Sequence, residues 1–247
     1  MAKQSQEQGD STGQQEISRR EERAGRILDA AGALILRWGY NKTTIDDVSR
    51  LAGVAKGTIY LHWKSREELF AALMRRENLV LARDIRQRIM DDPAGGTLRG
   101  ILKHSTLAIL KRPLMKAVLL GDMEVLGRLT HREHSNASYG ERLAGFISYL
   151  ELLREHGLVR TDMSLRAQMY TYSAIFMGFF LTRPFVPNEV TVSDEEMAEL
   201  MAETVHRTLE PPEPVSADAL ESTTKMFMGY LDRNIAIAQE KFQREVQ

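Results

Sequence analysis

The sequence contains no cysteine at any of its 247 positions. Without cysteine a chain forms no disulfide bonds, holds no zinc through thiolates and has no thiol nucleophile. This absence excludes disulfide-stapled secreted scaffolds, cysteine-type zinc modules and thiol enzymes. It fits a cytoplasmic protein, because disulfide bonds are rare in the cytoplasm.

Long hydrophobic runs are missing as well. The longest apolar stretch, AIFMGFFL at 174–181, is much shorter than the roughly 18 apolar residues that a membrane-spanning helix requires. The N-terminal segment is rich in Gln, Ser and Gly and lacks the apolar core of a signal peptide. We expect no membrane association, and we expect residues 1–17 to form a disordered polar leader.

The chain has no overall excess of charge of one sign, since 33 Lys and Arg residues stand against 34 Asp and Glu residues. Between residues 16 and 66, however, basic residues outnumber acidic ones. Such a local excess suits a surface that meets nucleic acid, but an ordinary mixed, solvated surface has the same composition. Charge by itself therefore does not decide between these two interpretations.

The motifs of the common catalytic folds are also absent. The sequence has no G-x-S-x-G elbow, no phosphate-binding P-loop and no G-x-G-x-x-G dinucleotide turn. The segment THREH brings His131, Glu133 and His134 together, but its histidines are three residues apart, whereas zinc proteases need a spacing of four. We therefore expect no enzyme activity, no bound metal and no cofactor.

What the sequence does contain is a succession of helices, which predicts an all-α fold. From about residue 18 to residue 38, apolar side chains recur at the spacing of one helix face, and Gly39 ends this helix. The predicted buried stripe consists of Ile27, Ala31, Leu34, Ile35 and Trp38.

Two short helices follow, over 45–52 and about 55–63, and Gly53 supplies the positive φ of the tight turn between them. Thr44 and Asp47 predict a capping box at the start of the first. Helices this short are stable only when packed. The side chains expected to face inward are Val48, Leu51, Val54, Ile59 and Trp63.

A second capping box, formed by Ser65 and Glu68, predicts a long helix over 66–90. The first helix and the two short helices, which all precede this long helix, then make the helix-turn-helix layout. In that layout the first residues of the second short helix reach the edges of bases in the DNA major groove.

The outward face of that helix has the side-chain chemistry for such contacts. Lys56 can donate to guanine O6 and N7, Tyr60 offers a hydroxyl and an apolar ring to a thymine, and Gly57 permits close approach of the backbone. Other polar side chains suit phosphate oxygens. The predicted DNA-binding residues are Thr44, Ile45, Lys56, Gly57, Thr58, Tyr60, Leu61, His62 and Lys64.

A plainer interpretation stands beside three of these assignments. Tyr60 can be a core aromatic, because it follows the inward-facing Ile59. His62 can be a hydrogen-bonded surface histidine, and Lys56 an ordinary solvated lysine.

Residues 24–70 resemble the DNA-binding domain of the tetracycline-repressor (TetR) family of bacterial transcriptional regulators. Two features depart from the family pattern: Trp63 stands where Phe is more frequent, and the acidic pair Asp46 and Asp47 stands where some relatives place a base-reading cation. The positions that agree with the pattern are Gly39, Thr44, Ile45, Val48, Ala52, Gly53, Val54, Gly57, Thr58, Tyr60, Lys64, Glu68 and Leu69.

The resemblance implies a helix-turn-helix domain over 18–65 and a larger helical domain for ligand binding and dimerisation over 66–247. It further implies a homodimeric repressor that binds a palindromic DNA operator and is released by a small-molecule effector. The alternative is a helical ligand-carrying or protein-interaction module whose helix-turn-helix no longer binds DNA.

Beyond residue 90, apolar spacing, Gly and Pro breaks and capping residues predict further helices. Their expected bounds are 97–111, 113–126, 138–156, 165–181, 194–209 and 217–244. The family resemblance assigns the dimer interface to two C-terminal helices, taken here as 165–181 and 194–209, with 217–244 as the rival.

An aromatic and methionine stripe along 165–181 suits core packing, a dimer surface or a ligand pocket. Its members are Met169, Tyr170, Tyr172, Phe176, Met177, Phe179 and Phe180. The predicted pocket for the effector consists of Met115, Met123, Phe146, Tyr149, Tyr170, Phe176 and Met177.

Overall fold

The structure is a computed structural model that describes residues 2–120, 137–213 and 215–246. In these ranges the chain is all-α, as predicted, with helices joined by turns and loops. The described residues divide into two compact units. One contains residues 2–79 and 236–246, and the other contains residues 80–120, 137–213 and 215–235.

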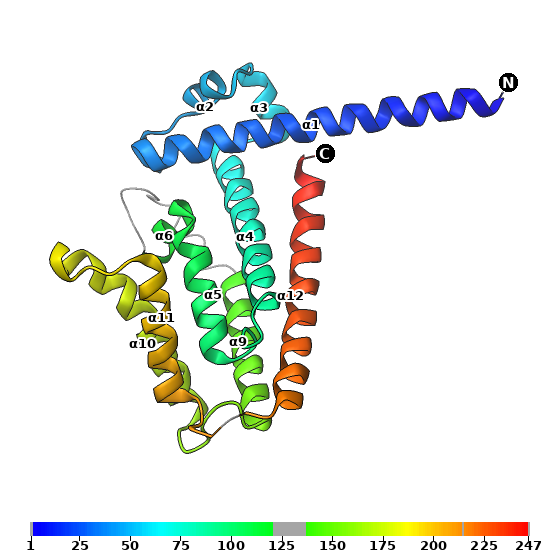
Figure 1. Cartoon of the computed structure of the whole chain (residues 1–247). Helices are drawn as coiled ribbons and strands as arrows, with labels where there is room; N and C mark the ends of the chain where they lie inside the picture. Colours follow the sequence, from blue (N-terminus) through cyan, green and yellow to red (C-terminus); the bar gives the residue numbers. More distant parts are fainter. Residues whose placement is uncertain (1, 121–136, 214, 247) are drawn as a thin grey trace. The chain divides into compact units, whose positions relative to one another are not determined.

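The N-terminal unit begins with α1, which is much longer than the apolar spacing predicts. The segment expected to be a disordered leader is helical, because α1 already starts at Ala2. Gln, Glu, Lys and Ala favour helix, and extending an existing helix is easier than nucleating one. The elements of this unit are α1 (Ala2–Trp38), η1 (Tyr40–Lys42), α2 (Ile45–Ala52), α3 (Lys56–His62) and the first part of α4 (Arg66–Met90). Figure 1 labels the α-helices among them.

The predicted stripe of α1 forms one side of the core of this unit. Ile27, Ala31, Leu34 and Ile35 are all buried, as the spacing predicts. The prediction is wrong for Trp38, which is exposed. Trp38 is the last residue of α1, and Gly39 turns the chain with φ 78° directly after it.

The division between the two compact units lies within α4, after Leu79. The domain boundary expected before residue 66 stays a prediction. The position of the division follows from packing, since Leu69, Phe70 and Leu73 are fully buried side chains of the N-terminal unit. Further along the same helix, Ile89 belongs to the core of the second unit. One uninterrupted helix therefore supplies side chains to both cores.

The second unit is a bundle whose helix bounds agree closely with the sequence predictions. The helices of this unit are α5 (Leu98–Leu110), α6 (Pro113–Leu120), α9 (Ala137–Glu155), α10 (Leu165–Thr182), α11 (Asp194–Leu209) and α12 (Ala217–Val246). The last turns of α12 belong to the first unit. Side-chain hydroxyls of Thr97, Ser164 and Ser193 cap α5, α10 and α11. The predicted continuation of α6 to residue 126 lies outside the described residues.

Within this unit α5 and α10 both pack against α11. The shared core includes Leu102, Leu150, Phe180 and Met201, which are almost completely buried. No helix in the described ranges combines the length and apolar character needed to cross a membrane.

Helix α12 is docked on this bundle through a close approach at Gly96. A Cβ atom at Gly96 would lie 1.7 Å from Thr224 Oγ1 of α12. The hydroxyl of Tyr149 donates to the Gly96 carbonyl oxygen at 2.6 Å, and the Tyr149 ring lies 4.3 Å from that of Phe227 on α12. Helix α12 is thus an integral part of the unit.

We expect Gly96→Ala to lower the free energy of unfolding by about 1–3 kcal/mol, because the new methyl group forces Thr224 and the backbone of α12 away. Chemical denaturation followed by circular dichroism measures this loss. The matched control is Gly229→Ala on α12 itself, where a Cβ has open space. Alanine favours a helix interior, so this control should be neutral or slightly stabilising. Equal stability of the two variants would contradict the proposed close contact.

Candidate nucleic-acid interface

The start of α2 is fixed by the predicted capping box. The backbone N–H of Asp47 donates to Thr44 Oγ1 at 3.2 Å, and the backbone N–H of Thr44 donates to Asp47 Oδ2 at 3.2 Å. At the other end Gly53 adopts a left-handed conformation with φ 65°, where side chains are disfavoured. The turn between α2 and α3 therefore forms as the sequence predicts.

The start of α4 is capped in a slightly different way. Ser65 Oγ accepts a hydrogen bond from the backbone N–H of Glu68 at 3.1 Å, as predicted. The Glu68 carboxylate, however, accepts from the backbone N–H of Lys64 at 2.8 Å. This bond ties the link after α3 directly to the first turn of α4.

The inward faces of α2 and α3 agree only in part with the prediction. Val48, Ile59 and Trp63 are buried, and Val54 is half-buried. Leu51 is 55% exposed, so its inward assignment is wrong. Leu51 lines the same shallow surface hollow as Trp38, at the point where α1 ends and no longer covers α2.

The outward face of α3 holds most of the predicted DNA-binding side chains. Tyr60 is 43% exposed and Leu61 73% exposed, so Tyr60 is not a core aromatic. Lys56, Gly57 and Lys64 are exposed, while Thr58 and His62 are half-buried. A polar and aromatic face thus opens outward from a short helix whose opposite face is held by the core.

Of the two residues predicted to contact DNA at the start of α2, one is buried and one is exposed. Ile45 is buried, because the first residue of α2 turns into the core, so its side chain is not available to DNA. Thr44 is exposed, but its hydroxyl already donates to Asp47 Oδ2 at 2.6 Å and accepts from the Asp47 backbone. Thr44 therefore has a structural role in capping α2.

An ion pair between α2 and α3 was missed by the sequence analysis. The Lys56 ammonium lies 2.9 Å from Asp46 Oδ1 and 3.0 Å from Oδ2. The hydrogen bond to Asp46 raises the pKa of Lys56 above its ordinary value. Opposite charges ten residues apart, on either side of a tight turn, were the only sequence signal for this contact.

Arg66 was also missed, and its contacts anchor the start of α4. Its guanidinium lies 4.2 Å from the centre of the Tyr40 ring. It donates to the backbone oxygens of Tyr40 at 3.4 Å and Thr43 at 3.2 Å. These contacts join α4 to the segment that leads into α2.

Most of the described residues predicted for a ligand pocket lie in or against the core of the bundle. Tyr149 is buried, and Phe146 and Phe176 pack against the core cluster, so these aromatics fill the bundle. Met115 is buried in α6, Met177 is half-buried in α10, and Met123 lies outside the described residues. The periodicity of aromatic and methionine residues does not distinguish core from pocket, so the effector pocket stays a prediction.

Tyr170 is the exception, because it is 78% exposed on α10. It lines an apolar groove of about 690 Å³ between α10, the segment that follows it, and α11. Ile175, Phe179, Val190 and Leu200 supply much of the apolar lining of this groove.

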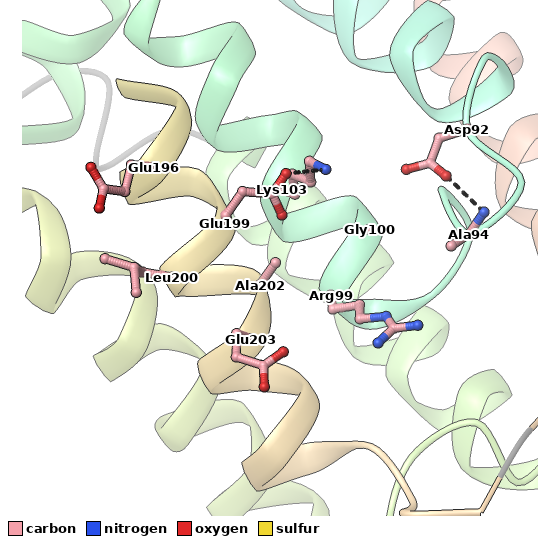
Figure 2. A pocket seen from close by; sticks show the side chains of 10 residues that line it. All are labelled: Asp92, Ala94, Arg99, Gly100, Lys103, Glu196, Glu199, Leu200, Ala202 and Glu203. Atoms are coloured by element: carbon pink, nitrogen blue, oxygen red, sulfur yellow. Dashed lines mark hydrogen bonds and ion pairs between the residues drawn. The ribbon is translucent and has the colours of Figure 1, made fainter. Parts of the chain in front are cut away.

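A second groove, of about 490 Å³, lies between α5 and α11 and is strongly charged (Figure 2). Several of its charged side chains already have partners. Lys103 pairs with Glu199 at 2.5 Å, and Asp92 pairs with His104 at 2.8 Å. These ion pairs join α5 to its neighbours and give the groove a structural role.

The described residues contain no group of three or more acidic, histidine or cysteine side chains arranged to hold a metal ion. The segment with His131, Glu133 and His134 lies outside the described ranges.

Comparison with known proteins agrees with the helix-turn-helix geometry. Residues 27–73 match the profile of the bacterial regulatory proteins of the tetR family. This range runs from the buried stripe of α1 through α2 and α3 into α4. This match identifies residues 27–73 as a DNA-binding domain of the TetR-family type. With this domain the chain is a DNA-binding transcriptional regulator.

Individual curated relatives match this chain over different lengths. The transcriptional regulator YhgD of Bacillus subtilis is 52% identical over 44 residues, which cover 18% of this chain and 23% of the relative. The regulator YvkB of the same organism is 24% identical over 176 residues, covering 70% of this chain and 90% of the relative. The higher of these two identities is confined to a short stretch of sequence.

Solved structures show the same fold. NalD of Pseudomonas aeruginosa, a secondary repressor of a multidrug efflux pump, aligns with a TM-score of 0.54 at 21% identity over 78% of this chain and 99% of its own. A transcriptional regulator of Streptomyces coelicolor, SCO4942, aligns with a TM-score of 0.57 at 20% identity over 77% of this chain and 98% of its own. The fold shared with these structures therefore extends beyond the helix-turn-helix into the second unit.

Proposed function

We propose that this TetR-family protein is a homodimeric repressor that binds a palindromic DNA operator and is released by a small-molecule effector. The observation that carries the proposal is the outward face of α3. Lys56, Gly57 and Tyr60 are exposed there, while Ile59 and Trp63 hold the opposite face in the core. This is the geometry that inserts a helix into the major groove.

Dimerisation is proposed through α10 and α11. A single reading helix contacts only a few base pairs, so useful specificity normally requires two copies on a two-fold symmetric operator. The apolar groove between α10 and α11 supports this choice, since Tyr170, Val190 and Leu200 are large apolar side chains left exposed there. Exposed apolar patches of this kind mark interaction surfaces.

Release by an effector is proposed to act through α4. This helix contributes Phe70 to the core of the DNA-binding unit and Ile89 to the core of the regulatory unit. A ligand that tilts α4 would change the spacing of the two reading helices in a dimer. Such a ligand must bind the DNA-incompetent state about 2.7 kcal/mol more tightly to produce a hundredfold bias.

A salt-dependent mobility shift tests the DNA-binding part of the proposal. Duplexes selected from a random pool should bind the protein tightly, and the affinity should fall steeply as salt rises, because phosphate contacts release counterions. Failure to select any duplex would favour the alternative of a helical carrier or interaction module. A ligand screen by thermal shift, followed by release of the selected duplex, tests the effector.

The proposal places the protein in the bacterial cytoplasm, where its DNA partner lies, and assigns it no catalysis and no cofactor. Its relatives are named as transcriptional regulators, which supports this view.

Single substitutions should distinguish the side chains that read bases from those that contact phosphates. We expect Lys56→Ala and Tyr60→Ala to weaken operator binding by about 1–3 kcal/mol and to relax preference at particular base pairs. Lys64→Ala should weaken binding to all sequences alike, because phosphate contacts contain no sequence information. Selection of preferred duplexes by each variant measures the difference. An unchanged preference in Lys56→Ala would remove Lys56 from the reading face.

A further inference from the structure

The guanidinium group of Arg66 lies on the segment that joins α1 to α2. It is 4.2 Å from the centre of the Tyr40 ring, within the range of a cation–π contact. The same group donates to the Tyr40 carbonyl at 3.4 Å and to the Thr43 carbonyl at 3.2 Å. One side chain in the first turn of α4 therefore binds both the ring and the backbone of the segment that leads to Thr44, the N-cap of α2.

Tyr40 has two further contacts with α4. Its hydroxyl donates to Glu67 Oε1 at 3.4 Å, and its ring meets that of Phe70 edge-on at 4.9 Å. Tyr40 is buried, and all of these residues belong to the N-terminal unit. The ring is thus held between Arg66, Glu67 and Phe70, so the segment that leads into α2 follows the first two turns of α4.

The first turn of α4 also holds the residues that follow α3. The Glu68 carboxylate accepts a hydrogen bond from the backbone N–H of Lys64 at 2.8 Å. Because α2 and α3 are joined by the tight turn at Gly53, the two short helices are attached to α4 at both ends of the pair. Arg66 makes the attachment before α2, and Glu68 makes the one after α3.

We propose that Arg66 is a positioning residue, which fixes the orientation of α2 and α3 on α4 through these contacts and not through a DNA phosphate. The inference rests on the proposed function, in which α3 reads the operator and α4 reports the effector. A reading helix that is free to rock must be ordered when it binds, and this ordering weakens affinity. A firm attachment also passes a movement of α4 to α3 without loss.

The test measures the affinity of Arg66→Met for a duplex that the wild type has selected from a random pool. Methionine keeps an unbranched apolar stem and removes the guanidinium group. Affinity should fall by about 5- to 30-fold, the size expected for a lost cation–π contact and a charged hydrogen bond. The slope of log affinity against log salt should not change, whereas the loss of one phosphate contact lowers its magnitude by about 0.9.

Arg66→Lys separates positioning from simple charge. A lysine ammonium binds phosphate as a point charge, so it would replace an arginine that contacts DNA. It lacks the planar fork that stacks on Tyr40 while it donates to two carbonyl oxygens. We therefore expect Arg66→Lys to remain at least about 3-fold weaker than the wild type, again with an unchanged salt slope.

Two control variants exclude general effects of stability and charge. Ile27→Val removes one methyl group from a fully buried side chain of α1, so it weakens the core of the same unit without touching Arg66. Lys225→Met removes an exposed cation from α12. Both variants should bind the selected duplex within about 2-fold of the wild type. Tryptophan emission shows that each protein is folded under the conditions of the binding assay.

Three results would each overturn the inference: wild-type affinity in Arg66→Met, a salt slope that falls by about 0.9 in that variant, or full recovery of affinity in Arg66→Lys. In each case the wild type still selects a duplex, so the proposed function stands. A wild-type protein that selects no duplex overturns the proposed function and this inference with it.

Discussion

Phe70→Ala is expected to lower the free energy of unfolding of the DNA-binding unit by about 3–5 kcal/mol and to abolish operator binding. Phe70 is among the largest fully buried side chains, and its ring meets that of Tyr40 edge-on at 4.9 Å. Removing it leaves a cavity beneath the segment that leads into α2. Domains typically have a free energy of unfolding of only about 5–15 kcal/mol, so this loss removes a large part of the unit's stability.

Intrinsic fluorescence can follow this unfolding selectively. The sequence has two tryptophans, Trp38 and Trp63, and both belong to the DNA-binding unit. Urea titration monitored by tryptophan emission therefore reports on this unit even if the regulatory unit unfolds separately. The matched control is Leu61→Ala, whose side chain is mostly exposed and whose loss should change stability by less than about 0.5 kcal/mol. A wild-type unfolding midpoint for Phe70→Ala would contradict the packing described for α4.

Leu200→Glu is expected to convert the dimer to a monomer and to weaken operator binding by at least about 100-fold. Leu200 is exposed on α11 and lines the apolar groove shared with α10. A carboxylate at this position would be buried without a partner in the proposed dimer, which is costly. Sedimentation velocity measures the change of mass, and a mobility shift measures the loss of affinity.

Met226→Glu serves as the matched control for the dimer. Met226 is similarly exposed, but it lies on α12, the rival helix for the interface. This variant should remain dimeric and retain operator binding. A monomeric Met226→Glu beside a dimeric Leu200→Glu would move the interface to α12 and contradict the present assignment. Circular dichroism confirms that both variants are folded.

Helix bounds were predicted well because their causes are local. The predicted range 45–52 matches α2, and 194–209 matches α11. Thr44 and Ser193 cap these helices through bonds to backbone groups three residues away. Such bonds depend on residues within one helical turn, so the sequence contains all the information that they require.

The side-chain environments were predicted less well. Leu51 was expected inside and is exposed, while Ile45 was expected to contact DNA and is buried. Both lie on the eight-residue α2, where the periodic pattern is too short to define a face uniquely. The outcome depends on where α1 ends and which side of α2 it covers.

At the candidate DNA-binding site, too, the sequence predicted which side chains are exposed but not which residues they contact. Exposure of Lys56 and Tyr60 followed from the buried positions of Ile59 and Trp63 on the same helix. The ion-pair partner of Lys56 could not be predicted in the same way, because Asp46 lies close to Lys56 only when the turn at Gly53 brings α2 and α3 together.

The sequence by itself determined the all-α class, the helix ends, the left-handed turn at Gly53 and the helix-turn-helix that identifies the family. Tertiary structure alone decided that Asp46 pairs with Lys56, that the Tyr149 hydroxyl donates to the Gly96 carbonyl, and that an apolar groove opens beside Tyr170. The physical reason is the distance along the chain over which each kind of interaction acts. Helix periodicity, caps and turns act over about four residues, whereas burial and long-range pairs depend on which distant helix packs against each side chain.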